Sequence, residues 1–197
     1  MTGRALAAAL WLVASTCTAV LAQDRPARDN TDNTAQDRPA EPNGYRMTDY
    51  RAPTPAALAG ARVVTTAQAG ALWKSGTAAF VDVLAQAPKP ANLPPGTLWL
   101  DKPRMDIPGS TWLPDTGYGA LAPSTETYLR KGLERVTKGD RSKLIVIYCL
   151  ADCWMSWNAA KRALAMGYKN VAWYPAGTDG WQAAGLPLHK ATPATGE

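Results

Sequence analysis

Residues 144–166 read LIVIYCLADCWMSWNAAKRALAM and predict a buried strand, a short loop and a helix in immediate succession. The apolar run Leu144–Tyr148 is typical of a strand in the middle of a parallel sheet, because such a strand is covered on both faces. Apolar residues then recur at helical spacing from Ser156 to Met166, and Gly167 follows the expected helix end. The sequence therefore predicts a central strand whose carboxyl end leads, through a loop that begins at Cys149, into a helix.

Strand and helix patterns alternate along the rest of the chain as well. Strands are expected at 61–65, 78–84, 144–148 and 171–174, and helices at 66–75, 123–139, 156–166 and 178–184. The segment 107–114 shows neither the helical nor the strand periodicity of apolar residues and is expected to be irregular. This order predicts an α/β sandwich, in which a central, mostly parallel sheet carries helices on both faces.

The first 22 residues follow the pattern of a secretory signal peptide. Arg4 provides a positive start, residues 5–20 form an apolar run, and Ala22 precedes the expected cleavage before Gln23. The run is too short to span a bilayer comfortably, so we expect a cleaved leader rather than an uncleaved anchor. The mature protein is then expected in the periplasm, an oxidising compartment, without attachment to the membrane.

Composition divides the remaining chain into four parts. Residues 23–44 are polar and repeat the word Gln-Asp-Arg-Pro, which predicts a disordered tether. Aromatic residues return among prolines at 45–60, which predicts an arm packed on the domain. The domain itself is expected at 61–190 and is followed by a short tail at 191–197.

Charge and rare residues exclude several functions. The chain has 21 Lys+Arg and 16 Asp+Glu, a net charge of +5 without a basic block, which argues against nucleic-acid binding. Its single histidine, His189, lies in a polar stretch and is expected to be an ordinary surface residue. Only three cysteines are present, and Cys17 would be lost with the leader, so the usual four soft ligands of a metal site are missing. We therefore expect neither a bound metal nor a bound cofactor.

Cys149 lies where reactive groups gather in parallel sheets, at the carboxyl end of the central strand. The loop that follows consists of Leu150, Ala151, Asp152, Cys153, Trp154 and Met155, and Ser156 is expected to cap the next helix. Such a loop directs backbone N–H groups inward, and the helix N-terminus adds about half a positive charge. This position lowers the pKa of a thiol and predicts a nucleophilic Cys149, whereas the alternative is a buried, inert cysteine.

Cys153 is close enough in sequence to resolve a persulfide or mixed disulfide that forms on Cys149. The two sulfurs can be joined only if their Cα atoms lie within about 7 Å of each other. Such a disulfide would be either a switch that exchanges with a substrate or a purely structural link.

Four short sequences occur in the order and spacing typical of one fold. They are Phe80-Val81-Asp82-Val83, Ile107-Pro108-Gly109-Ser110, the Cys149 loop and Gly177-Thr178-Asp179-Gly180-Trp181. Across most of residues 61–188 the chain resembles rhodanese-like proteins. This resemblance implies the rhodanese-like α/β sandwich and sulfur-transfer chemistry at the loop cysteine.

The run from Tyr148 to Arg162 is similar to the signature of a narrower family, the exported proteins named for PQQ-dependent catabolism and a CXXCW motif. In this chain three residues separate the two cysteines. The resemblance implies a periplasmic location, an indirect association with PQQ enzymes, and a partner such as a periplasmic PQQ dehydrogenase or its cytochrome. It does not supply a reaction.

The loop departs from the better-known relatives in two ways. Rhodanese-type loops hold six residues, whereas Cys149–Met155 holds seven, as in phosphatase-like relatives; Met155 stands where those carry an arginine that clamps phosphate. Asp152 also places a negative charge against a thiolate and an incoming dianion. The loop therefore favours a neutral persulfide, thiol or disulfide as substrate over thiosulfate or phosphate.

Three further residues are candidates for a supporting role. Asp82 ends an expected strand and could orient the loop amides or Arg104, or could simply satisfy neighbouring backbone. Trp154 and Trp157 lie one helical turn apart and could form an aromatic wall for a substrate or partner, or could pack in the core. We expect Trp154, which is part of the loop, to be partly exposed.

These observations leave two functions open. The first is an exported sulfur or thiol–disulfide transferase, with Cys149 as the nucleophile and Cys153 as the resolving thiol. The second is a non-catalytic accessory module that docks on a PQQ dehydrogenase or its cytochrome partner. Asp152, the absence of cations in the loop and the polar tether favour the second function.

Overall fold

The apolar run that follows Leu144 forms the centre of a five-stranded parallel sheet in the computed structural model, which describes residues 38–100 and 102–196. Its strands are β1 (Arg62–Val63), β2 (Ala79–Asp82), β4 (Thr111–Trp112), β5 (Ile145–Tyr148) and β6 (Val171–Tyr174). They lie in the order β1-β6-β5-β2-β4, and every neighbouring pair is parallel. All four residues of β5 are buried, which confirms the central position that the sequence predicts.

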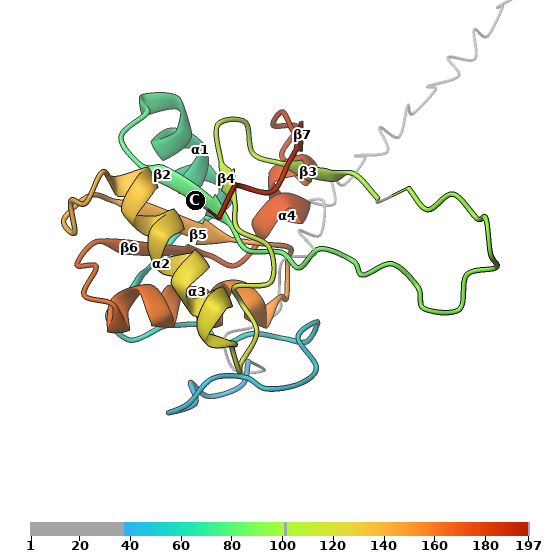
Figure 1. The fold of residues 1–197 in the computed structure, drawn as a ribbon. Helices are drawn as coiled ribbons and strands as arrows, with labels where there is room; N and C mark the ends of the chain where they lie inside the picture. Colours follow the sequence, from blue (N-terminus) through green and yellow to red (C-terminus); the bar gives the residue numbers. More distant parts are fainter. Residues whose placement is uncertain (1–37, 101, 197) are drawn as a thin grey trace, which may run out of the picture. The chain divides into compact units, whose positions relative to one another are not determined.

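Helices cover both faces of this sheet (Figure 1). They are α1 (Thr66–Ser75), α2 (Pro123–Thr137), α3 (Trp154–Ala165) and α4 (Gly177–Ala183). Ile145 and Ile147 of β5 pack in one buried cluster with side chains of α2 and α3, whereas Val146 and Tyr148 pack in the other with side chains of α1 and α4. Successive strand residues point to opposite faces, so one strand contributes to both cores. The α/β sandwich predicted from the sequence is confirmed.

A second, two-stranded sheet lies beside the first. β3 (Arg104–Asp106) pairs antiparallel with β7 (His189–Ala191), and Asp106 lies opposite His189. The sequence pattern does not predict β3 or β7. The expectation that 107–114 is irregular is wrong, since Thr111–Trp112 forms the edge strand β4. Strands of two or three residues are too short to show a period of two, so pairing partners rather than local pattern determine them.

Helix α3 begins two residues before its expected start and α4 one residue before, whereas α1 begins at residue 66 as expected. Thr65 caps α1 and forms a capping box with Gln68. Cys153, not Ser156, is the N-cap residue of α3. Ser156 lies inside the first turn, where its hydroxyl donates to the Cys153 carbonyl at 3.0 Å. The expectation that Ser156 caps the helix is therefore wrong, because the extended backbone of Cys153 already ends the loop.

Residues 38–60 run along α3 and the loop before it. Asn158 of α3 holds this arm at Arg46: the Asn158 Oδ1 accepts from the Arg46 N–H, and the Asn158 Nδ2 donates to the carbonyls of Arg46 and Gly117, at 2.9 to 3.0 Å. Further along, the indole N–H of Trp154 donates to the Pro53 carbonyl at 3.0 Å. The expected leader and most of the expected tether, residues 1–37, lie outside the described residues. Among those described, no helix has the length and apolar content needed to cross a membrane.

Replacing Asn158 with alanine tests this attachment. Asn158 is fully buried, so its loss leaves backbone groups of the arm without partners, and we expect the free energy of unfolding to fall by about 2 kcal/mol. Denaturant unfolding measures the change, and faster tryptic cleavage after Arg46 or Arg51 reports release of the arm. Asn170→Ala, at an exposed asparagine, is the matched control and should change stability by less than about 0.5 kcal/mol. Equal effects of both variants would show that Asn158 does not anchor the arm.

Candidate functional site

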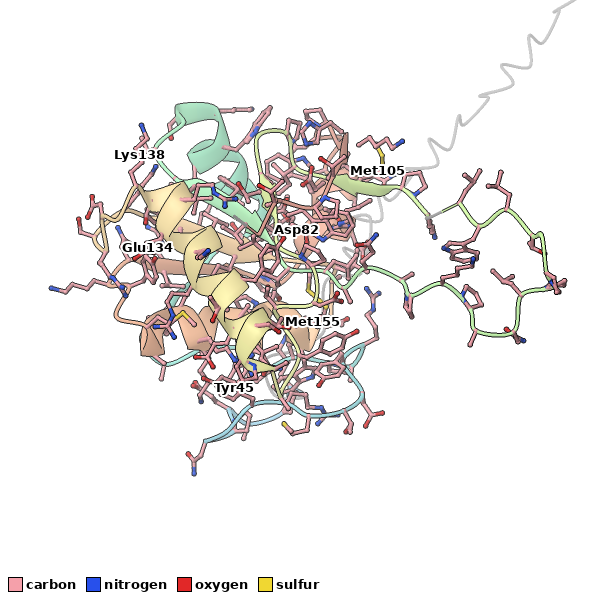
Figure 2. All side chains as sticks on the ribbon, in the orientation of Figure 1. Tyr45, Asp82, Met105, Glu134, Lys138 and Met155 are labelled. Carbon is pink, nitrogen blue, oxygen red and sulfur yellow. A yellow bond between two sulfur atoms is a disulfide. The ribbon has the colours of Figure 1, made fainter. Side chains whose placement is uncertain are left out.

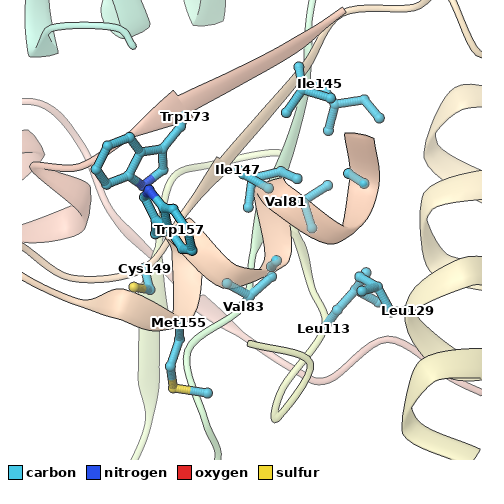
Figure 3. Close-up of a cluster of buried hydrophobic side chains, with 14 of the residues drawn as sticks. Val81, Val83, Leu113, Leu129, Ile145, Ile147, Cys149, Met155, Trp157 and Trp173 are labelled. Carbon is cyan, nitrogen blue, oxygen red and sulfur yellow. The ribbon is translucent and has the colours of Figure 1, made fainter. Parts of the chain in front are cut away.

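Cys149 follows β5 directly and is joined by a disulfide to Cys153. Their Cα atoms are 6.5 Å apart, within the range that a disulfide needs. Both are buried: Cys149 is 0% exposed and Cys153 is 2% exposed. Figure 3 shows Cys149 at the edge of the cluster formed with Trp157, Trp173 and Met155. The structure thus brings together the two cysteines that the sequence singles out, at the predicted end of the central strand.

Two backbone carbonyl oxygens lie near the Cys149 sulfur. Its Sγ lies 3.4 Å from the Cys153 carbonyl oxygen and 3.8 Å from that of Leu150. This differs from the expected convergence of backbone amides on the sulfur. Carbonyl dipoles present their negative ends to the sulfur and therefore disfavour a thiolate at Cys149, so the disulfide is the form that these surroundings suit.

Two of the loop amides already have partners. The Ala151 N–H donates to the Asp179 carboxylate at 3.1 Å, and the Trp154 N–H donates to the Tyr50 carbonyl at 2.8 Å. An incoming dianion would have to displace a carboxylate from the first of these amides. This arrangement supports the sequence-based preference for an uncharged sulfur substrate over thiosulfate or phosphate.

A buried ion pair fixes the carbonyl of Cys149. Arg104 Nε lies 2.5 Å from Asp82 Oδ2, and the same guanidinium lies 3.4 Å from the Cys149 carbonyl and 3.3 Å from the Thr178 hydroxyl, to both of which it donates. Burial raises the pKa of Asp82, and Arg104 opposes this rise. Figure 2 shows Asp82 near the middle of the domain. Of the roles considered for Asp82, the structure shows that it holds Arg104, and its other oxygen accepts from the Leu84 N–H.

Next to this pair lies a second buried carboxyl. Asp106 Oδ1 is 2.7 Å from His189 Nε2, so His189 is exposed as expected but also pairs with a buried carboxyl, which the sequence did not predict. Burial, and to a lesser extent the charge of Asp82, raise the pKa of Asp106 from 3.8 to about 6, against the lowering effect of His189 and Arg104. The folded protein therefore holds this proton more tightly than the unfolded chain does. The resulting stabilisation is complete below about pH 4 and is lost as the pH rises through about 6.

The remaining loop residues are mostly buried. Trp154 is 2% exposed, so the expected partial exposure is wrong: the arm covers it, with Arg46 placed over its ring at 5.2 Å. Its ring meets that of Trp157 edge to face, at 5.4 Å between centroids, and the Trp157 indole N–H donates to the Ala57 carbonyl. Both tryptophans therefore anchor the arm rather than form an open wall.

Three loop positions differ in exposure. Met155 is buried, Asp152 is exposed with a left-handed backbone (φ 47°), and Leu150 is half-buried. Leu150 also borders a surface cavity of about 220 Å³, which Leu84, Lys102, Arg104 and Trp112 line as well. Within the described part of the chain, Leu150 is thus the loop residue that lines this cavity.

Sequence reasoning missed the residues that reach the loop from elsewhere. Thr178 and Asp179 belong to one of the four short sequences typical of the fold, but no contact with the loop was predicted for them. The Thr178 N–H donates to the Cys149 carbonyl at 3.0 Å. Asp106 gave no signal because it lies in a strand too short to show a pattern. The described residues contain no cluster of three or more potential metal ligands.

The rhodanese-like domain family matches residues 101–184 of the chain. Together with the sheet order described above, this match shows the α/β rhodanese-like fold. The match does not show the narrower PQQ-associated family, and no curated protein matches the sequence.

Several solved structures are similar to this chain. A thiosulfate sulfurtransferase from Pseudomonas aeruginosa is 20% identical with a TM-score of 0.46; the match covers 68% of this chain but only 21% of that protein. The polysulfide-sulfur transferase of Wolinella succinogenes is 18% identical with a TM-score of 0.42, over 68% of this chain and 82% of that one. A possible tyrosine phosphatase from Rhodopseudomonas palustris is 24% identical with a TM-score of 0.42, over 66% and 85%. At these identities the likeness concerns the fold alone.

Gly177 packs so closely on the cysteine loop that it offers a test of the loop's rigidity. Its backbone is left-handed (φ 51°), and a Cβ there would collide with the carbonyl of Cys149. We expect Gly177→Ala to lower the free energy of unfolding by about 3 kcal/mol and to speed reduction of the disulfide by dithiothreitol. Gly185→Ala is the matched control, since Gly185 has a similar φ of 69° but open space around it, and should cost only about 1 kcal/mol.

The rate of disulfide reduction separates the two glycines. It should rise in Gly177→Ala and stay at the wild-type value in Gly185→Ala, because only the first substitution displaces the backbone of Cys149. An unchanged reduction rate in a folded Gly177→Ala protein would show that this contact does not hold the loop.

Proposed function

We propose that the chain is a thiol–disulfide exchange protein built on a rhodanese-like domain, with Cys149 and Cys153 as the exchanging pair. The observation that carries this proposal is the disulfide between them, at the end of the central strand. The Ala151 and Trp154 amides are occupied and Met155 replaces the phosphate-clamping arginine, which supports a thiol, disulfide or persulfide as substrate. A purely structural disulfide is the outcome that would contradict it.

The wider setting is part of the same proposal. We infer from the leader-like first 22 residues that the protein is exported to the periplasm, where a disulfide persists. The resemblance of the run from Tyr148 to Arg162 to the PQQ-associated CXXCW proteins supports an indirect link to PQQ-dependent alcohol catabolism. In this setting the electrons or sulfur would pass between this pair and thiols in the periplasm.

Intact mass spectrometry of the chain from residue 23 tests the exchange. The purified protein should be two hydrogens lighter before treatment with dithiothreitol than after it. When the reduced protein meets oxidised glutathione, the wild type should return to the internal disulfide. Cys149→Ser and Cys153→Ser should each stop at a mixed disulfide with glutathione, because the resolving thiol is gone. A disulfide that dithiothreitol does not open in the folded protein would overturn the proposal and leave a structural link.

A second candidate function rests on a different observation. Leu98 and Leu100 are 81% and 74% exposed, on the segment between β2 and β3 that extends away from the domain in Figure 1. Exposed apolar side chains of this kind suit a docking surface. They are consistent with an accessory module that binds a periplasmic PQQ dehydrogenase or its cytochrome partner without using its cysteines.

Two substitutions distinguish this second candidate from exchange. If docking is the function, a Leu98→Ser/Leu100→Ser double variant should lose both capture of the dehydrogenase or cytochrome and growth on alcohol, whereas Cys149→Ser should retain both. If exchange is the function, Cys149→Ser should abolish growth on alcohol and the leucine variant should retain it. Growth of the producing cells and pull-down from periplasmic extract measure the two results.

A further inference from the structure

Arm residues 50–52 pair with the cysteine loop as a short antiparallel strand. The Trp154 N–H donates to the Tyr50 carbonyl at 2.8 Å, and the Ala52 N–H donates to the Asp152 carbonyl at 3.0 Å. These two bonds flank an antiparallel bridge in which Arg51 lies directly opposite Cys153. The loop edge Asp152–Trp154 therefore binds residues 50–52 through two backbone hydrogen bonds, and the Trp154 indole N–H adds a third bond at Pro53.

The geometry of this bridge places the residue at position 51 next to the sulfur-bearing residue. Arg51 and Cys153 form the non-hydrogen-bonded kind of pair, in which Cα atoms lie about 4.5 Å apart and the side chains extend to the same side. Arg51 itself makes only an exposed ion pair with Asp179, 3.7 Å away, and more than half of its side chain is exposed. Such a pair contributes little to stability, so nothing in the packing of the domain requires arginine here.

We propose that the edge Asp152–Trp154 is the docking site for an extended polypeptide segment that carries a cysteine, and that the arm occupies this site within its own chain. The proposal rests on the thiol–disulfide exchange proposed above and names its substrate class, a protein thiol bound by strand addition. The register fixes the position of the substrate cysteine: it takes the place of Arg51, opposite Cys153. Cys153 is then the sulfur that meets the substrate, and Cys149 is the resolving sulfur.

The surroundings of the two sulfurs agree with these roles. Cys153 is the N-cap residue of α3, so the helix N-terminus stabilises negative charge on its sulfur. Cys149 is fully buried and faces carbonyl oxygens, so it leaves as a protonated thiol and not as a lasting thiolate, while Arg104 fixes its backbone carbonyl. The sequence-based assignment of Cys149 as the nucleophile is thereby reversed within this proposal.

The exchange balances without a further reactant. The substrate thiol loses its proton to solvent, and the thiolate attacks the Cys153 sulfur. A substrate–Cys153 disulfide forms as the Cys149–Cys153 bond breaks, and Cys149 leaves with the electron pair and takes a proton. A second thiol of the substrate can then attack the substrate sulfur, which releases an oxidised substrate and the reduced Cys149 and Cys153 pair.

Synthetic peptides test the site in trans. The parent peptide spans residues 46–57 with Arg51→Cys, and a scrambled peptide of the same composition is the reference. Incubated with the oxidised protein, the parent should form a mixed disulfide on Cys153 at least about fivefold faster than the scrambled peptide. Peptide mapping by mass spectrometry identifies the sulfur that carries the adduct.

The Ala52→Pro substitution should act in opposite directions in the peptide and in the protein. In the peptide it removes the N–H that donates to Asp152, so the adduct should form about fivefold more slowly. In the protein it weakens the chain's own arm, so the parent peptide should react about fivefold faster. Ala56→Pro is the matched control, because it also creates a Pro-Pro pair in the arm but lies away from the bridge, and should change neither rate.

A full-length Arg51→Cys protein tests the register in cis. We expect a disulfide between position 51 and Cys153, with Cys149 open to alkylation, whereas Ala56→Cys should keep the Cys149–Cys153 disulfide. Equal adduct rates for parent and scrambled peptides, adducts on Cys149, or an unchanged Cys149–Cys153 disulfide in Arg51→Cys would each overturn the docking site. If oxidised glutathione and dithiothreitol still exchange with the pair in those cases, the proposed function stands and only its substrate class is wrong.

Discussion

Burial of the disulfide brings the backbone around it into contact with other segments, whose polar groups pair with it and determine the rest of the site. Arg104 and Thr178 bond to the Cys149 carbonyl, the Asp179 carboxylate accepts from the Ala151 N–H, and the arm pairs with Asp152 and Trp154. These partners come from β3, α4 and residues 50–52, segments far apart in sequence. The loop conformation therefore depends on contacts from across the fold.

This pairing separates the site from the anion-binding loops that the same architecture supports. An anion site needs free amides around a helix N-terminus, but here carbonyl oxygens face the Cys149 sulfur and a carboxylate occupies the Ala151 amide of the loop. The guanidinium of Arg104, which bonds to the Cys149 carbonyl, is also committed, because it compensates the buried Asp82. Removing Arg104 would leave a buried carboxylate unpaired, so this arginine is not free to bind a substrate anion.

The parts of the fold that the sequence predicts are those with a local signal. The apolar run 144–148, the helical periodicity after Pro123 and the four landmarks identify the sheet centre, a covering helix and the rhodanese-like order. The predicted site residues Cys149, Cys153 and Asp82 lie together at the end of β5 and β2. Trp154 was expected to be exposed because nothing in a single sequence tells which surface the arm at 45–60 covers; that contact joins residues about a hundred positions apart.

The arm is held unevenly along its length, and this matters for access to the disulfide. Asn158 fixes it at Arg46 and the Trp157 indole fixes it at Ala57, whereas residues 50–53 are held by two backbone hydrogen bonds to the loop, by the Trp154 indole N–H on the Pro53 carbonyl and by the Gly119 N–H on the Tyr50 hydroxyl. Each such bond contributes only about 1 kcal/mol, less than the burial of one tryptophan. The middle of the arm can therefore open while both anchors stay in place, so that the buried disulfide becomes accessible without loss of the fold.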